Sequence, residues 1–290
     1  MKKKTEENKY STIFVDGYPP QRHMIRDLRV SLEFQGKSRS TIRAPVVQEV
    51  CTDHGAMHVG VMATLVDIIG GALSIRAVYP DWAATADLWI HTSRRATSGM
   101  VEAAGSVLKA GRTTVVAEVE IREEAPNSSH QKRSIGSAMM TFSRLSRRQD
   151  TPELEMDERS AETFHFAIDG SGLNQPYLDE VGVRVLDKAG GVIEVTMSNY
   201  IRNSFGSLQG GIVAILGDVA GQQAARALTG KPLITSDLAI HYLSQGKVGP
   251  FRTKATVLRT TGDTALTRVE VIDRGSDDCL TALVMNTATL

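Results

Sequence analysis

The feature that most constrains the fold is an internal repeat. Residues 52–67 and 203–218 each begin with a glycine-containing turn, continue into an apolar segment and end in an aspartate. The two aspartates are 151 positions apart, and the segments that follow, 85–91 and 235–241, repeat at an offset of 150. A nearly constant offset over so many residues indicates a duplicated unit of about 120 to 130 residues. We therefore predict two domains of the same fold.

Hydrophobic periodicity predicts the same order of elements in both copies, namely two strands, one long apolar helix and four further strands. The predicted helices are residues 60–77 and 211–228. The predicted strands are residues 28–34, 40–44, 86–91, 101–110, 113–122 and 135–144 in the first copy, and 181–186, 192–198, 237–242, 252–260, 265–272 and 280–289 in the second. The predicted divisions are an N-terminal arm (1–22), a first domain (23–145), a charged linker (146–163) and a second domain (164–290).

This order of elements predicts an α+β fold. A helix that is apolar on most sides needs cover all round, and an antiparallel sheet curled around it provides that cover. Gly70 and Gly71 inside the first helix indicate close packing on that side. Because a single such sheet would leave an open edge, we expect the two copies to pair edge to edge, with their helices side by side.

The composition excludes several classes of partner. The chain has 33 basic and 33 acidic side chains, so its formal net charge of zero does not indicate binding to nucleic acid or to an anionic membrane. Its start is basic but no apolar run follows, and no stretch reaches the roughly 18 apolar residues of a membrane span, so we expect a cytoplasmic protein. Cys51 and Cys279 lack the spacing of a metal site, and no metal or other cofactor is expected.

The turn and helix carry a recognisable motif. It consists of an asparagine, a glycine, a histidine or glutamine followed by two glycines, an aspartate eight or nine residues later, and a strand that opens with Ser/Thr-x-Asp. The second copy matches it at Asn203, Gly206, Gln209, Gly210, Gly211, Asp218, Thr235 and Asp237. The first copy matches it at Gly55, His58, Gly60, Asp67, Thr85 and Asp87, but has Thr52 and Val59 where asparagine and glycine are expected. The pattern resembles hotdog-fold acyl-CoA thioesterases of the phenylacetic-acid-degradation type.

The resemblance implies active sites between two hotdog units, each built from both copies, and acyl-CoA as the substrate. The first site would combine Asn203, Gln209, Gly210 and Gly211 with Asp67 and Thr85. The second would combine Thr52, His58 and Val59 with Asp218 and Thr235. Only the first retains every motif element, so we expect it to be the working site. The resemblance also implies further assembly, and we expect a homodimer of double hotdogs.

The residue types suit thioester hydrolysis. A backbone N–H at a helix N-terminus stabilises negative charge that develops on the acyl oxygen, and Gly210 has no Cβ to obstruct the thioester. Val59 has a branched side chain at the matching position. Asp67 is a candidate general base or a candidate nucleophile, and the sequence does not choose between these roles. Thr85 would orient the water, and Asn203 would position Asp67 or the substrate.

Cations are also needed for the phosphates of CoA. Arg94 and Arg112 are the candidates in the first copy, together with Arg95 and Lys109, and Lys247, Arg252, Lys254 and Arg259 are candidates in the second. Ordinary surface charge explains any one of them equally well.

Several alternatives stay open. Each aspartate could cap the helix of the neighbouring unit, and Asn203 and Thr52 could be plain turn residues, which is the interpretation we favour for Thr52. His54, His58 and His91 are expected to be structural, as no acid lies at triad-like spacing. A non-catalytic module that binds acyl-CoA or lipid is the main alternative function. A hotdog hydratase ranks last, because Asp53 and His54 are adjacent and precede the motif glycine.

Overall fold

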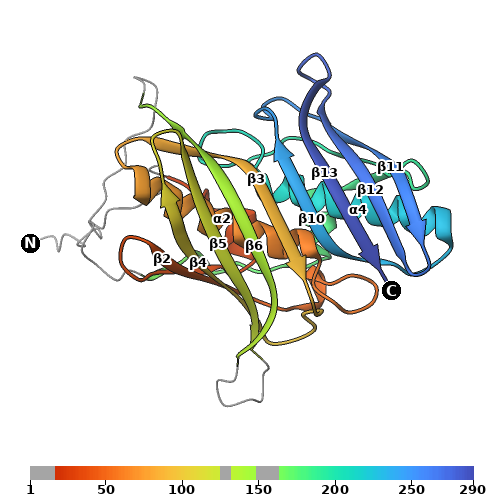
Figure 1. The fold of residues 1–290 in the computed structure, drawn as a ribbon, viewed down its shortest axis with the longest axis horizontal. Coiled ribbons are helices and arrows are strands. Elements are labelled where there is room, and N and C mark those ends of the chain that lie inside the picture. Colours follow the sequence, from red (N-terminus) through yellow and green to blue (C-terminus); the bar gives the residue numbers. More distant parts are fainter. Residues whose placement is uncertain (1–16, 125–131, 148–162) are drawn as a thin grey trace, which may run out of the picture.

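The computed structural model describes residues 17–124, 132–147 and 163–290. Within them, thirteen strands form one continuous antiparallel sheet, and two long helices lie side by side against one of its faces (Figure 1). The strand order is β7-β1-β2-β4-β5-β6-β3-β10-β13-β12-β11-β9-β8. The first repeat therefore supplies one half of the sheet and the second repeat the other half, as the sequence predicts.

The two halves have matching elements. The first half contains α1 (Met24–Asp27), β1 (Ser31–Phe34), β2 (Arg39–Pro45), η1 (Gln48–Val50), α2 (Val59–Val78), β3 (Trp82–Thr92), β4 (Met100–Ala110), β5 (Thr114–Glu124) and β6 (Lys132–Leu145). The second half contains α3 (Tyr177–Val181), β8 (Arg184–Asp187), β9 (Val192–Val195), α4 (Gly210–Thr229), β10 (Ile234–Tyr242), β11 (Phe251–Thr261), β12 (Thr264–Asp273) and β13 (Cys279–Thr289). Between them lies β7 (Thr163–His165).

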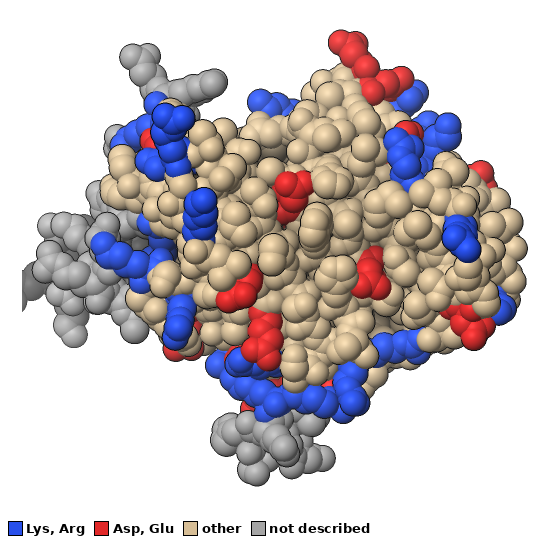
Figure 2. All heavy atoms as spheres, viewed as in Figure 1, with Lys and Arg blue, Asp and Glu red and all other residues tan. Residues whose placement is uncertain are grey.

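The halves meet where β3 pairs with β10 in antiparallel register. Two ion pairs cross this seam on the exposed face of the sheet, His91 with Asp237 at 2.6 Å and His241 with Asp87 at 2.5 Å. The two aspartates repeated in the sequence therefore face the paired strands. Elsewhere on this face charged side chains are sparse near the middle and gather toward the rim, as Figure 2 shows.

The two helices approach each other closely at their N-terminal halves. A Cβ on Gly60 would lie 2.8 Å from the Cα of Ile215, and a Cβ on Gly211 would lie 2.4 Å from the side chain of Thr64. Glycine is needed at both positions because backbone contacts backbone. Gly70 likewise packs against the sheet, where its Cβ would lie 2.3 Å from the Met140 sulfur. Because of this close approach, the N-terminal ends of both helices lie at the boundary between the halves.

Three predicted features differ from the structure. The strand expected at residues 181–186 is present as β8 but starts only at Arg184, because α3 covers residues 177–181 and ends at Gly182, whose φ is +80°. Strand β7 was assigned to the second domain, yet it pairs with β1 and extends the first half of the sheet. Part of the expected N-terminal arm and the following turn form an ordered segment, residues 17–30, which contains α1. Most of the expected linker lies outside the described residues.

Helix α2 also corrects the expectation about membrane spans. By length and composition alone it could cross a membrane, but 78% of its most apolar window is buried between the sheet and α4. That burial is typical of a core helix.

Candidate active site

One cavity of about 370 Å³ lies at the boundary between the two halves. Its wall includes Asp67 from α2, Thr85 from β3, Asn203 from the turn before α4, and Gly210 from the first turn of α4. Gln209 is also in the wall, so the cavity unites five of the six residues expected to form the working site, and Gly211 is the one that does not line it. These residues come from segments about 140 residues apart in the sequence.

Asp67 is held by two neutral side chains. Thr85 donates its hydroxyl proton to Asp67 Oδ1 at 2.8 Å, and Gln209 donates from Nε2 to Asp67 Oδ2 at 3.1 Å. Only 8% of Asp67 is exposed. Burial raises its pKa from 3.8 to about 6, and the hydrogen bond from Thr85 limits that rise. The carboxylate is therefore ionised at neutral pH and remains basic enough to take a proton.

The first turn of α4 lies directly against this carboxylate. A Cβ on Gly210 would be 2.6 Å from Asp67 Oδ2, so a larger residue there would collide with it. Gln209 caps the helix, since its Oε1 accepts from the Gly211 amide at 2.6 Å. Among the described residues none accepts a hydrogen bond from the Gly210 amide. The helix therefore presents a backbone donor, reinforced by its dipole, beside a buried base.

Asn203 shapes the turn that precedes α4. Its Oδ1 accepts from the backbone amides of Phe205 at 2.9 Å and Ser207 at 3.0 Å. These bonds assign the oxygen to the turn, so the amide nitrogen is the group that Asn203 can present to the cavity. Both expected roles of Asn203, turn residue and substrate contact, are compatible with this geometry.

Two tyrosines in the cavity wall were not expected from the sequence. Tyr242, at the end of β10, donates to the Gly210 carbonyl oxygen at 3.0 Å. Tyr18 reaches the cavity from the N-terminal segment. Burial raises the pKa of both phenols, and the negative charge of Asp67 adds to the shift. The repeat offers no tyrosine that matches Tyr18 or Tyr242, since Thr92 stands at the position that corresponds to Tyr242.

The second expected site is closed. Asp218 is fully buried and its Oδ2 accepts from the Gly60 amide at 2.9 Å, while His58 Nδ1 lies 3.5 Å away. Burial by itself would raise the pKa of Asp218, but His58, Thr235 and the Gly60 amide together lower it below the ordinary value. Thr235 in addition accepts from Asn286 at 2.8 Å. Asp218 therefore caps the neighbouring helix, the alternative left open for both aspartates.

The remaining residues of the second site have structural contacts. Thr52 accepts from the His54 amide at 3.3 Å within the turn, which agrees with the favoured interpretation as a turn residue. Val59 is the first residue of α2 and is 4% exposed, and the side chain of His58 before it makes no capping bond. The branched Val59 side chain is thus buried at the position where the first site has Gly210 directly against the Asp67 carboxylate.

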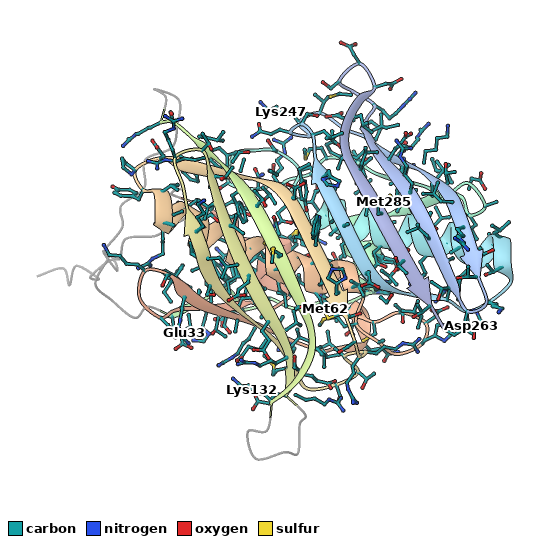
Figure 3. All side chains as sticks on the ribbon, in the orientation of Figure 1. Glu33, Met62, Lys132, Lys247, Asp263 and Met285 are labelled. Carbon is teal, nitrogen blue, oxygen red and sulfur yellow. The ribbon has the colours of Figure 1, made fainter. Side chains whose placement is uncertain are left out.

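The expected phosphate-binding arginines do not line the cavity. Arg94 follows the end of β3 at Thr92, whereas the cavity contacts the start of the strand at residues 83–86, roughly 30 Å away. Arg112 lies in the turn between β4 and β5 and is exposed. Lys247 directly follows Gly246 in the cavity wall, and Figure 3 shows it at the outer edge of the molecule beyond β10. It is the candidate cation nearest the cavity in the chain.

Among the described residues, no group of three or more His, Cys, Asp or Glu side chains is arranged to hold a metal ion. Asp67 is also the one charged side chain among the described residues that form the cavity wall. The site offers a carboxylate, backbone and amide donors, and an otherwise neutral surface.

Comparisons with known proteins agree with this architecture. The sequence pattern of the thioesterase superfamily matches residues 54–129 and again residues 205–280. No curated protein matches the chain by sequence. Among solved structures, a candidate thioesterase II from Thermobifida fusca has a TM-score of 0.59 at 15% identity, covering 89% of this chain and 96% of its own.

Two further solved structures span both halves in the same way. The tesB protein of Mycobacterium avium subs paratuberculosis has a TM-score of 0.58 at 13% identity, with 89% of this chain and 95% of its own covered. An acyl-ACP thioesterase from Bacteroides thetaiotaomicron has a TM-score of 0.53 at 10% identity, with 86% and 97% covered. At these identities the likeness establishes the fold, a double hotdog of two tandem units.

Proposed function

Because the chain belongs to the thioesterase superfamily, we propose that it hydrolyses acyl-CoA to a free acid and CoA in the cavity between its two halves. The observation that carries the proposal is the position of Asp67, a buried carboxylate whose pKa is raised to about 6 and which lies against the N-terminus of α4. A base and a donor for developing negative charge are then adjacent, as acyl transfer requires.

The reaction follows from these groups. The thioester carbonyl oxygen accepts from the Gly210 amide, so that negative charge formed on that oxygen is stabilised at the helix N-terminus. With Asp67 as general base, it takes a proton from water as the water oxygen bonds to the acyl carbon. The C–S bond then breaks, and the proton passes from Asp67 to the departing thiolate. With Asp67 as nucleophile, its carboxylate bonds to the acyl carbon and the C–S bond breaks, so that CoA leaves as the thiolate. Water then cleaves the anhydride into the acid and the restored Asp67 carboxylate, and a proton from that water passes to the thiolate.

The other side chains position these two groups. Gln209 holds Asp67 with its nitrogen and the helix with its oxygen, so its amide fixes the carboxylate relative to the α4 N-terminus. Thr85 fixes the other carboxylate oxygen. The nucleotide of CoA carries phosphates and stays in water, where Lys247 lies close to the cavity wall. Arg94 lies too far along β3 to serve here. Arg112 stays a candidate, because its turn accepts a hydrogen bond at the Thr113 carbonyl oxygen from the Arg144 amide, next to Ser143 of the cavity wall.

The test measures hydrolysis of a panel of acyl-CoA substrates of different acyl length, with the release of free thiol as the readout. Asp67→Asn is expected to lose at least a hundredfold in turnover while acyl-CoA still binds, because general-base catalysis contributes about 10² to 10⁴ in rate. Asp218→Asn is the matched control, and we expect a milder effect on turnover. Binding without thiol release by the unaltered protein, or full activity in Asp67→Asn, would refute the proposal. The first outcome would favour the binding module.

Single turnover in H₂¹⁸O distinguishes the two roles of Asp67. On excess enzyme, water that opens an Asp67 anhydride at Asp67 Cγ leaves ¹⁸O in the Asp67 carboxyl group, which shows a nucleophile. Label in the released acid alone fits both a general base and an anhydride opened at the acyl carbon, so the reaction is also quenched early, and a covalent acyl group on Asp67 then shows the nucleophile. Mass spectrometry of the peptide that contains Asp67 reads the outcome.

A further inference from the structure

The N-terminal segment, residues 17–30, forms part of the cavity wall. Tyr18 and Ile25, both from residues 17–30, line the cavity together with the motif residues. Ile25 is only 2% exposed, and Tyr18 is half-buried. Tyr18 lies before the first repeat, whereas Ile25 belongs to α1, whose counterpart in the second half is α3 (Tyr177–Val181).

The segment is fastened to the turn that carries Asn203. His23 Nε2 donates to the Arg202 carbonyl oxygen at 2.9 Å, and the Tyr18 hydroxyl donates to the same oxygen at 3.3 Å. The Met24 amide donates to the carbonyl oxygen of Tyr200 at 3.2 Å. These three contacts bind the segment to the residues immediately before Asn203, so it is a fixed wall.

The segment is also braced internally. The guanidinium of Arg26 donates to the carbonyl oxygens of Pro19 at 2.6 Å and Pro20 at 2.8 Å, and to that of Phe166 at 2.7 Å. Two of these charge-assisted hydrogen bonds hold the backbone of Pro19 and Pro20, and the third ties Arg26 to Phe166. The ring of Tyr18 is therefore positioned before any ligand binds.

The exposed and buried parts of the cavity wall differ in chemistry. Phe205, Leu243 and Gln245 are exposed, and Lys247 follows them in the chain, so CoA phosphates would remain on this side. Ile68 and Ala72 on α2 are buried, as is Ile25. Apolar groups that are removed from water in this way suit the acyl group rather than the nucleotide.

From these contacts we infer that residues 17–30 belong to the acyl-binding site, and that Tyr18 and Ile25 limit the size of the neutral acyl group that the cavity accepts. The inference rests on the proposed function for its substrate class. Neutrality follows because Asp67 is the one charged side chain among the described residues of the wall, and it would repel an acyl group that ends in a carboxylate.

Equilibrium binding tests the inference without turnover. Asp67→Asn would be titrated calorimetrically with butyryl-, octanoyl-, dodecanoyl- and succinyl-CoA, alone and combined with Ile25→Ala or Tyr18→Ala. Each buried methylene is worth a factor of about four in affinity. We expect Ile25→Ala to raise the affinity for longer acyl groups relative to butyryl-CoA by about tenfold, because space for about two methylenes opens. Succinyl- and butyryl-CoA are also compared as non-hydrolysable thioether analogues on the unaltered protein, which keeps the Asp67 charge, and the succinyl analogue should bind more weakly there.

Ile135→Ala is the matched control, since Ile135 is a fully buried isoleucine near the far end of β6 from the cavity. It should leave the ranking of acyl groups unchanged. Tyr18→Phe, which keeps the ring, should behave the same way, whereas Tyr18→Ala should shift the ranking. A uniform change for all acyl groups, an unchanged ranking in Ile25→Ala, or equally tight binding of the succinyl and butyryl analogues by the unaltered protein would overturn the inference.

Thiol release by the unaltered protein separates the two proposals. If the ranking of acyl groups shifts but no acyl-CoA is hydrolysed, the role of residues 17–30 in acyl binding is confirmed and the proposed catalysis fails. If acyl-CoA is hydrolysed and the ranking does not shift, only the inference about residues 17–30 fails. Absence of binding for the whole panel would refute both.

Discussion

Replacing Asp67 by asparagine should make the protein more stable while it abolishes the proposed activity. The hydrogen bonds can be kept in the variant. The Asn side-chain oxygen accepts from Gln209 as the carboxylate does now, and the side-chain nitrogen donates to the Thr85 hydroxyl, which can act as acceptor. The change therefore removes a buried charge while both polar groups of the asparagine keep a partner.

The magnitude comes from the pKa of Asp67. Burial raises it from 3.8 to about 6, so between these pH values the folded protein holds a proton that the unfolded chain has released. Stability of the unaltered protein therefore falls as pH rises through this window. A shift of about two pKa units costs about 3 kcal/mol once the pH exceeds 6, at about 1.4 kcal/mol per unit. Asp67→Asn avoids this cost.

The assay is urea denaturation at pH 4, 5, 6, 7 and 8. The stability of Asp67→Asn minus that of the unaltered protein should grow from near zero at pH 4 to about 3 kcal/mol above pH 6. Asp218→Asn is the internal control, and it should lower the stability where Asp67→Asn raises it. The pKa of Asp218 is lowered, so the loss in that variant should be constant above pH 5 and shrink only in stronger acid. A pH-independent difference for Asp67→Asn, or a loss of stability at pH 8, would refute the reasoning.

Three further predictions concern the site and its support. The kcat/KM for acyl-CoA should fall about tenfold per pH unit below the Asp67 pKa of about 6. Thr85→Val should move this acidic limb of the pH profile to higher pH, because the Thr85 hydroxyl favours the ionised carboxylate. An acidic limb at the same pH in Thr85→Val would contradict the assignment to Asp67. In Gly210→Ala the added Cβ would lie 2.6 Å from Asp67 Oδ2, so kcat should fall more than a hundredfold while the circular dichroism spectrum stays unchanged. Retained turnover would show that catalysis does not require the Asp67 carboxylate at its place beside the first turn of α4. Burial lowers the pKa of His23 to about 4, so stability should fall by about 3 kcal/mol as pH drops from 6.5 to 4, and urea denaturation of His23→Gln should lack this component.

The interior of each half could be predicted from the sequence. Helix α2 was expected at residues 60–77 and is found at 59–78, and α4 was expected at 211–228 and is found at 210–229. Buried apolar helices fix their own limits, because the hydrophobic pattern ends where burial ends. The central strands were predicted for the same reason, since each alternates between a helix-facing side and an exposed side.

The margins of the sheet could not be predicted as well. Strand β7 has three residues, and its pairing with β1 joins His165 to Ser31, far apart in the chain. Nothing local in residues 163–165 indicates that pairing. Helix α3 did have a local signal, because Pro176 precedes it and Gly182 ends it in the left-handed conformation. A proline before and a glycine after a short segment are typical helix boundaries.

The candidate site could likewise be predicted only in part. The repeat singled out Asp67, Thr85 and Gln209 because their positions recur at a fixed offset, and the structure brings them within hydrogen-bonding distance. Tyr18 has no repeated counterpart, and its place in the wall depends on contacts to a turn more than 180 residues away. A duplication therefore reveals the shared parts of two sites and conceals what only one of them has.

The same duplication also explains why the two sites differ. In both halves an aspartate lies against the first turn of the neighbouring helix. Gln209 has an oxygen for the second helix amide and a nitrogen for Asp67, so the helix is capped from within and the carboxylate keeps a raised pKa. His58 makes no capping bond, so the Gly60 amide turns to Asp218 instead, and that aspartate is held ionised. The side chain before the helix thus decides whether the facing aspartate becomes a cap or a base.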